Sequence, residues 1–157
     1  MAKTHMSKDG NYQISIKTKI GYISIFADKN SITDIEFNKN VKANPNKLLI
    51  KTKKMIASYL SGEIVNFDNI NVKLSENKRF YEYIRKIPYG KTKSYSEIGK
   101  HFNIHPRKVG LLLSKNRIPI IIPCHRIIYK NGKLGGFNAG KEWKKFLLKT
   151  EGNINIG

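Results

Sequence analysis

The sequence predicts two domains: an α/β N-terminal domain, residues 1–74, built from a small antiparallel sheet and helices, and a mostly α-helical C-terminal domain, residues 75–157, with a helix-turn-helix DNA-binding unit. Three observations support this prediction. Apolar and polar residues alternate between residues 12 and 37, as in strands with one buried face. Apolar residues recur at helical spacing in short segments after residue 75. Between the two parts, Asn66–Ser75 is polar and irregular, which favours a linker.

The alternating region divides into three predicted strands. Tyr12–Lys17 and Tyr22–Ala27 flank a polar turn near Lys19–Gly21, which is typical of a β-hairpin. Ile32–Phe37 is expected to add the third strand, with its isoleucines and phenylalanine as the apolar positions.

A helix is predicted to follow the strands, opening at Pro45 and ending near Gly62, which suits a C-terminal cap. We interpret its lysines as the solvated face. His5-Met6 resembles a cloning junction, so residues 1–6 are assigned no function. Nothing in this half resembles a catalytic group.

The second half begins with short predicted helices. Ser75 is expected to cap a helix that runs to Ile87. Ser94 and Glu97 fit a capping box, in which each side chain closes the backbone donor of the other, so a helix is predicted over Tyr95–Phe102. A turn follows, and Pro106 suits the first position of the next helix.

Two short helices joined by a tight turn favour helix-turn-helix DNA binding in a basic chain, although such pairs also occur in domains that never touch DNA. Gly110 lies in the middle of the second helix, where glycine costs about 1 kcal/mol relative to alanine. We therefore expect Gly110 to permit the close approach of another group.

Positive charge dominates the composition. Thirty Lys and Arg residues against eleven Asp and Glu residues leave a net charge of +19 among 157 residues, far more than solubility requires. Such a field favours a polyanionic partner, nucleic acid before an anionic membrane. We see no membrane-spanning run and no signal peptide, so we expect a soluble, intracellular protein that is cytoplasmic and nucleoid-associated, or nuclear in a eukaryote.

The single cysteine, Cys124, follows a short apolar run, Ile118–Pro123. Its β-branched residues predict a buried strand whose prolines lie at the ends. A lone cysteine is often only a small buried apolar residue, whereas the adjacent His125 favours a nucleophile. From Cys124 and its neighbours alone, the two interpretations are about equally supported. One cysteine excludes an internal disulfide and a zinc site made of several thiolates, and we expect no metal and no cofactor.

The C-terminal end contains a predicted strand, Ile127–Tyr129, and an Asn131-Gly132 turn that favours a hairpin with two positive φ values. Leu134–Gly140 is glycine-rich and is interpreted as a mobile lip over a pocket. A closing helix then presents Trp143 and other apolar residues on one face and ends at Glu151. An acid at this end opposes the helix dipole, so Glu151 is either a solvated end residue or has a specific partner.

Together these residues resemble the O6-alkylguanine-DNA alkyltransferases, single-use proteins that take alkyl groups from guanine in DNA. The matching segments lie within residues 76–152, in the order and about the spacing of the family: Ile87-Pro88-Tyr89-Gly90, Ser94-Tyr95, Arg107-Lys108-Val109-Gly110, Asn116, Pro119 through Arg126, Leu147-Leu148 and Glu151-Gly152. The resemblance implies an RNase H-like first domain and a winged-helix-like arrangement in the second.

The resemblance also implies a role for each matching residue. Cys124 attacks the alkyl carbon, His125 takes the thiol proton through a water molecule, Glu151 holds His125, and Tyr95 donates a hydrogen bond or proton to the leaving guanine. Arg107 wedges into the base stack, and Asn116 ties its helix to the active-site segment. The other implied contacts are DNA binding by Lys108, Ser94 and Arg126, and guanine binding by Ile127, Asn138 and Phe137 and by the backbone of Cys124.

The implied partner is double-stranded DNA that contains O6-alkylguanine, bound by a monomer. The chain departs from the family at Lys108 and Leu111–Leu113, where the family usually has small residues, and in the loop Phe137–Gly140. Two other functions stay open on the residues alone. One is a helix-turn-helix protein that binds DNA or lesions without chemistry, and the other is a thiol hydrolase that turns over many times.

Overall fold

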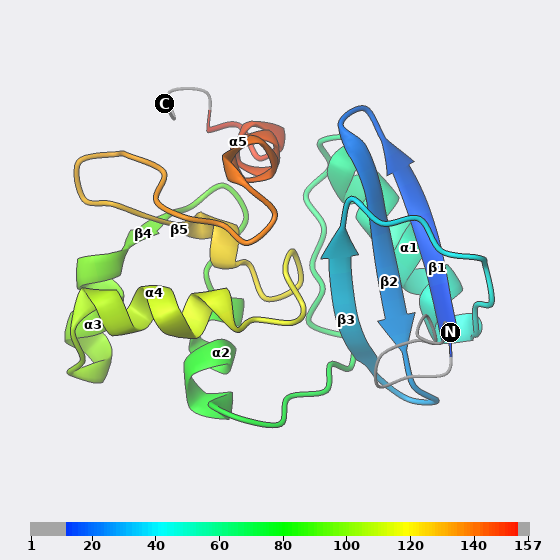
Figure 1. Ribbon diagram of the computed structural model, residues 1–157, viewed down its shortest axis with the longest axis horizontal. Coiled ribbons are helices and arrows are strands. Elements are labelled where there is room, and N and C mark those ends of the chain that lie inside the picture. Colours follow the sequence, from blue (N-terminus) through cyan, green and yellow to red (C-terminus); the bar gives the residue numbers. More distant parts are fainter. Residues whose placement is uncertain (1–11, 154–157) are drawn as a thin grey trace. The chain divides into compact units, whose positions relative to one another are not determined.

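A computed structural model describes residues 12–153, so residues 1–6 lie outside the described part (Figure 1). The chain forms two compact units. The first extends to Glu76 and also includes Arg117–Pro119, whereas the second comprises Asn77–Asn116 and the chain from Ile120 onward. Whether residues 1–74 and 75–157 are separate folding domains remains a prediction.

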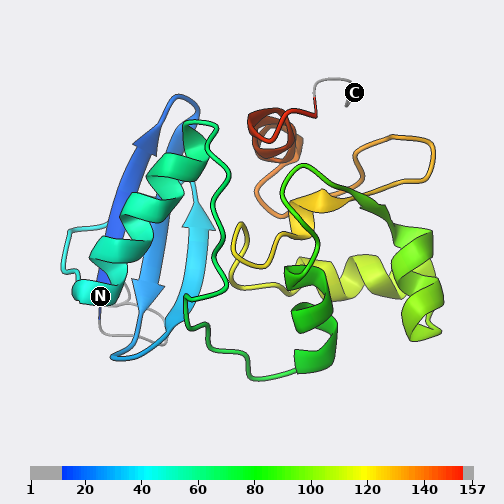
Figure 2. The ribbon, with the colours of Figure 1, turned by 180° about the vertical axis from the view of Figure 1, so that it is seen from behind.

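The first unit contains the predicted antiparallel sheet, in the order β1 (Tyr12–Thr18), β2 (Gly21–Ala27) and β3 (Ile32–Phe37). The predicted hairpin and third strand are confirmed. The central strand β2 has the most buried residues, with Ile23 opposite Ile16 and Phe37, and Ile25 opposite Ile14 and Ile35. One face of this sheet is covered by a helix (Figure 2).

That helix, α1 (Lys47–Leu60), begins two residues later than the prediction that Pro45 opens it. Asn46 is the N-cap, and its side chain accepts a hydrogen bond from the Leu49 amide. Proline has no such acceptor, whereas asparagine is among the best N-cap residues. Gly62 follows the helix with a φ of 98°, in agreement with its predicted place at the end.

The segment predicted to be a linker is in part packed on the sheet. Ile32 of β3 donates to the carbonyl of Asn71 at 2.8 Å and accepts from the amide of Lys73 at 2.9 Å. Arg117 also contacts β3, where its guanidinium pairs with Asp34 at 2.8 Å. The polar composition of Asn66–Ser75 does not reveal these backbone hydrogen bonds to the edge of the sheet, so the sequence did not predict them.

The second unit begins with α2 (Lys78–Arg85), which is shorter at both ends than predicted. Asn77 is left-handed, with a φ of 52°, and a left-handed residue cannot continue a right-handed helix from Ser75. Phe80, Tyr81 and Ile84 are its buried residues. Tyr83 stacks on His101, with ring centroids 4.1 Å apart.

A pair of helices, α3 (Tyr95–Phe102) and α4 (Pro106–Ser114), follows strand β4 (Lys93–Ser94). The capping box is confirmed, since Ser94 N–H donates to Glu97 at 2.7 Å and Glu97 N–H donates to the Ser94 hydroxyl at 3.0 Å. Pro106 occupies the predicted position at the start of α4. Asn103 takes the left-handed conformation between the helices, with a φ of 56°.

The predicted strand Ile118–Ile122 is wrong. These residues are buried, but they form a turn in which Ile120 has a φ of 75°. Pro119 and Pro123 have no amide hydrogen to donate to a strand ladder, and the run is too short to pair between them. The turn leads into a short 3₁₀ helix, Cys124–Arg126.

The next predicted strand exists but pairs differently. β5 (Ile127–Ile128) pairs in parallel with β4, and Lys133–Phe137 forms no second strand of a hairpin. At the predicted turn, Gly132 has a φ of 88° whereas Asn131 does not take a positive φ, so a tight two-residue turn is not formed. Helix α5 (Lys141–Thr150) closes the chain as predicted.

Candidate active site

Cys124 lies at the start of the 3₁₀ helix, with its amide bonded to the carbonyl of Ile122 at 2.7 Å. The residue is buried. Burial raises the pKa of its thiol, while a hydrogen bond from Asn116 and the charge of Lys144 act in the opposite direction without reversing the shift. The thiol is therefore protonated at neutral pH, and its use as a nucleophile requires a base.

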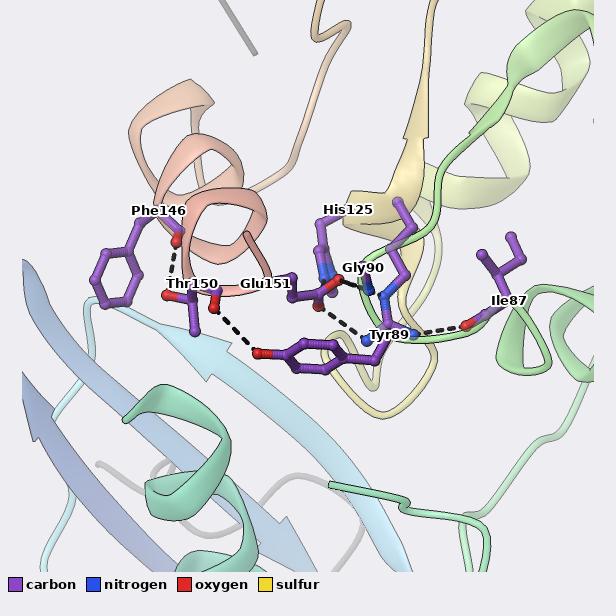
Figure 3. A network of polar contacts seen from close by, with 8 residues as sticks. Ile87, Tyr89, Gly90, His125, Phe146, Thr150 and Glu151 are labelled. Atoms are coloured by element: carbon purple, nitrogen blue, oxygen red, sulfur yellow. Dashed lines mark hydrogen bonds and ion pairs between the residues drawn. The ribbon is translucent and has the colours of Figure 1, made fainter. Parts of the chain in front are cut away.

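The base is available in the next residue. The Nε2 atom of His125 lies 2.7 Å from Oε2 of Glu151, which is the C-cap of α5 (Figure 3). Both side chains are fully buried. The structure thus brings together two site residues that are separated by 26 positions in the chain.

Glu151 also accepts hydrogen bonds from two further residues. Arg126 donates to it from Nε at 2.9 Å and from a terminal nitrogen at 2.9 Å, and the amide of Gly90 donates at 3.0 Å. The same guanidinium donates to the carbonyl of Ile87 at 2.6 Å. Nearby, the Tyr89 hydroxyl donates to the carbonyl of Thr150 at 3.1 Å (Figure 3). These partners explain why an acid stands at a helix end where the dipole disfavours it.

The ionisation of this network follows from its partners. Burial alone raises the pKa of the Glu151 carboxyl, but the hydrogen bonds and charges of His125 and Arg126 outweigh burial and hold this pKa well below its ordinary value. Burial lowers the pKa of His125 despite the neighbouring carboxylate. At neutral pH we therefore assign a carboxylate, a guanidinium and a neutral imidazole. In that state Nε2–H donates to Glu151, and the lone pair of the imidazole lies on Nδ1.

Arg126 is consequently corrected from a DNA-binding residue to a partner of Glu151. Its exposed fraction is only 7%, and its guanidinium donors are directed at Glu151 and Ile87. Ser94 is corrected for a similar reason, since it is buried and its hydroxyl caps α3. Neither side chain is presented to a phosphate.

Tyr95 is the first residue of α3 and is buried beside Tyr129, with ring centroids 4.8 Å apart. Burial, followed by the charges of Tyr129 and Cys124, raises the pKa of Tyr95 to about 12. Its phenol is therefore a proton donor at any physiological pH. Gly135 is required next to this ring, because a Cβ atom there would lie 2.5 Å from the Tyr95 hydroxyl.

Asn116 lies just after α4 and donates from its side-chain amide to the carbonyl of Ile122 at 2.9 Å. This contact joins the end of α4 to the turn that precedes Cys124. Among the guanine-binding residues predicted from the resemblance, Asn138 donates from its side chain to the carbonyl of Ser114 at 2.5 Å, and Phe137 is half-buried. Arg107 and Lys108 are exposed on α4.

Lys144 is the site residue that sequence reasoning missed. It is fully buried, and its Nζ atom donates to the carbonyls of Ile127 at 2.6 Å, Leu134 at 2.5 Å and Gly136 at 3.2 Å. It also lies 3.5 Å from the Tyr95 hydroxyl. Burial lowers the pKa of Lys144 to about 8. A signal existed, because Lys144 shares the apolar face of α5 with Leu147 and Leu148 at helical spacing.

No group of three or more His, Cys, Asp or Glu side chains within residues 12–153 is placed to hold a metal ion. No helix in the same range is long and apolar enough to cross a bilayer.

Comparison with known proteins gives concordant results. The family model described as 6-O-methylguanine DNA methyltransferase, DNA binding domain, matches residues 75–153. The methylated-DNA–protein-cysteine methyltransferase of Methanosarcina acetivorans is 34% identical over 90% of this chain and 99% of its own length. The protein of the same name from Metallosphaera sedula is 34% identical over 85% of this chain and 88% of its own.

Solved structures are similar as well. Mycobacterium tuberculosis OGT in complex with DNA is 29% identical, with a TM-score of 0.78 over 88% of this chain and 91% of that one. An O6-methylguanine DNA methyltransferase from Methanococcus jannaschii is 28% identical, with a TM-score of 0.68 over 92% of this chain and 95% of its own. The similarity therefore covers both the sheet-containing part and the part that holds Cys124.

Proposed function

The chain belongs to the family of methylated-DNA–protein-cysteine methyltransferases, and on this premise we propose that it repairs O6-alkylguanine in duplex DNA by irreversible transfer of the alkyl group to Cys124. The observation that carries the proposal is the buried contact between His125 and Glu151 directly beside the single cysteine. It provides a lone thiol with an oriented base.

The proposed reaction is an in-line displacement at a saturated carbon. His125 accepts the proton of the Cys124 thiol through a water molecule, while Glu151 holds the imidazole in the tautomer with its lone pair on Nδ1. The sulfur then attacks the alkyl carbon, the bond from that carbon to O6 breaks, and guanine leaves. Tyr95 supplies a hydrogen bond or proton to the leaving base, which would otherwise depart as an anion. The product is a thioether, which no group of the proposed site hydrolyses, so each molecule acts once.

The substrate must leave the base stack before it can reach a buried sulfur. Flipping a base costs a few kcal/mol, and less when alkylation has weakened its pair. We propose that Arg107 fills the stack in place of the flipped nucleotide, and that Lys108 contacts phosphate. Both are exposed on α4, and the net charge of +19 favours the approach to DNA.

We further propose that α3 and α4 act as a helix-turn-helix unit on DNA, with the carbonyls and amides at Cys124, Ile127 and Asn138 binding the guanine edges. The Ile127 carbonyl already accepts from Lys144, but a carbonyl oxygen has a second lone pair. The RNase H-like and winged-helix-like arrangements, the monomeric state and the cytoplasmic or nucleoid location remain predictions.

Mass spectrometry of the intact protein tests the proposal. After incubation with duplex DNA that contains O6-methylguanine, we expect one added methyl group per molecule, on the peptide with Cys124, and no further turnover with excess substrate. Binding of the lesion without modification of the protein would instead favour the non-catalytic alternative. Repeated turnover would favour a thiol hydrolase.

The proposed wedge can be separated from the chemistry. We expect Arg107→Ala to slow repair in duplex DNA about tenfold or more, because the flipped state loses the side chain that replaces the base, while reaction with free O6-methylguanine base changes little. The rates are measured by single-turnover quench. Equal losses in the two assays would remove the wedge role.

A further inference from the structure

The short segment Arg117–Pro119 belongs to the first compact unit, although the residues on both sides of it belong to the second. It lies in the part of the chain that leads from α4 to Cys124. The Arg117 carbonyl accepts a hydrogen bond from the Ile35 amide of β3 at 2.9 Å. The chain before the cysteine is thus attached to the sheet of the first unit, a part of the protein in which the sequence indicated no catalytic group.

The side chain of Arg117 strengthens this attachment. Its guanidinium donates to Oδ1 of Asp34 from Nε at 2.9 Å and from a terminal nitrogen at 2.8 Å. Asp34 lies on β3 and is only 3% exposed. A carboxylate this deeply buried is costly unless a cation and hydrogen bonds satisfy it, so the pair is a specific contact and not a chance meeting of surface charges.

The residue before Arg117 acts directly on the site. The side-chain amide of Asn116 donates to the Ile122 carbonyl at 2.9 Å, and the backbone amide of Cys124 donates to the same oxygen at 2.7 Å. One carbonyl thus joins the two residues through its two lone pairs. A hydrogen bond from Asn116 also favours the thiolate of Cys124. Displacement of Asn116 would therefore change both the position and the ionisation of the thiol.

The turn between these contacts has a conformation that needs support. Ile120 has a φ of 75°, in the left-handed region, which a β-branched residue rarely adopts. Such a conformation persists only where the surrounding structure fixes it. The hydrogen bond from Asn116 to Ile122 closes the turn around Ile120, and the contacts of Arg117 with β3 hold its first residues.

From these contacts we propose that Asp34 and Arg117 are positioning residues for alkyl transfer. The ion pair fixes the backbone beside Asn116, and Asn116 in turn holds the turn before Cys124 and favours its thiolate. The first unit thereby contributes to the chemistry through the position of Asn116 and not through a reacting group of its own. This inference rests on the proposed function.

Single-turnover transfer from the free base O6-methylguanine, measured against pH, tests the proposal without a contribution from DNA binding. We expect Asp34→Asn to slow transfer about tenfold at neutral pH and to move the midpoint of the pH–rate profile upward by about 0.5 pH units or more, because a displaced Asn116 stabilises the thiolate less. A purely structural role would reduce the fraction of active protein, which the amplitude reports, and would leave the rate constant and the midpoint unchanged.

A double-mutant cycle identifies the interaction. Arg117→Gln is expected to match Asp34→Asn, and the double variant to be no slower than either, because all three lose the same contact. Asn116→Ala is expected to lose at least as much, with little further loss when Asp34→Asn is added to it. The double variant keeps a neutral hydrogen-bonding pair, so it gives the result if a single variant does not fold. Circular dichroism of each variant confirms folding.

Glu36→Gln is the matched control, since Glu36 lies on the same strand and pairs with Lys39 at 3.3 Å. We expect it to leave the rate and the profile unchanged. The inference would be overturned by an Asp34→Asn rate within twofold of the wild type with an unmoved midpoint, by an equal loss in Glu36→Gln, or by additive losses in the cycle. Methyl transfer to the wild-type protein tests the proposed function separately, so an active wild type that Asp34→Asn equals refutes only the positioning role.

Discussion

Cys124→Ser is expected to reduce alkyl transfer by about 10⁴-fold or more, because the hydroxyl that replaces the thiol is far less acidic and less polarisable. The buried thiol already has a raised pKa, and in the proposed reaction His125 accepts its proton. A serine hydroxyl in the same place cannot be deprotonated to a useful extent by an imidazole without an oxyanion site to stabilise the reaction. The methyl content of the Cys124 peptide after reaction, measured by mass spectrometry, gives the result.

The substitution changes one buried atom, so loss of fold is not the expected cause. Circular dichroism should be unchanged, and binding of the O6-methylguanine duplex should persist within about threefold, because the exposed groups of α4 are intact. Since the chain has a single cysteine, a methyl group found on any other residue, or transfer that continues in the serine variant, would contradict the assignment.

Glu151→Gln is expected to lower the free energy of unfolding by about 3 kcal/mol and to slow alkyl transfer by about a hundredfold or more. The amide keeps the shape of the carboxylate but not its charge, which leaves the buried guanidinium of Arg126 without its counter-ion. It also offers His125 a weaker acceptor, so the imidazole is less firmly held in the tautomer that accepts a proton at Nδ1. Urea unfolding and single-turnover kinetics measure the two effects.

Glu142→Gln is the matched control, because Glu142 lies in the first turn of the same helix and is exposed. We expect it to change the free energy of unfolding by less than about 0.5 kcal/mol and the rate very little. If both variants behaved alike, the buried network around Glu151 would have no special role.

The same network predicts the acid sensitivity of the protein. The pKa of Glu151 is lower in the folded state than its ordinary value of 4.5, so its contribution to stability is complete above that pH and is lost as the pH falls further. The pKa of His125 is also lowered from 6.5, so the folded state begins to lose stability below about pH 6.5, where the unfolded chain binds the extra proton. The stability difference between wild type and Glu151→Gln should therefore shrink below pH 4.5. A constant difference across that range would contradict the lowered pKa of Glu151.

Interactions between residues close together in the sequence made several strands and helices of this protein predictable. The three strands follow from alternation along short stretches, and α3 and α4 follow from the capping box of Ser94 and Glu97 and from Pro106. Glu151, the acid at the end of α5, could also be recognised as unusual from the sequence, because its unfavourable interaction with the helix dipole arises within one helical turn. These signals depend on residues only a few positions apart.

What the sequence left open was decided by contacts between distant segments. The apolar run before Cys124 has the composition of a strand, yet its prolines and a left-handed Ile120 make it a turn. Arginine is a common phosphate-binding residue, yet Arg126 is buried and donates to Glu151, 25 residues away. Lysine is usually a surface residue, yet three backbone carbonyls hold Lys144 in the interior. A side chain's type states which partners it can accept, but only the packing of the whole chain determines which of them comes within hydrogen-bonding distance.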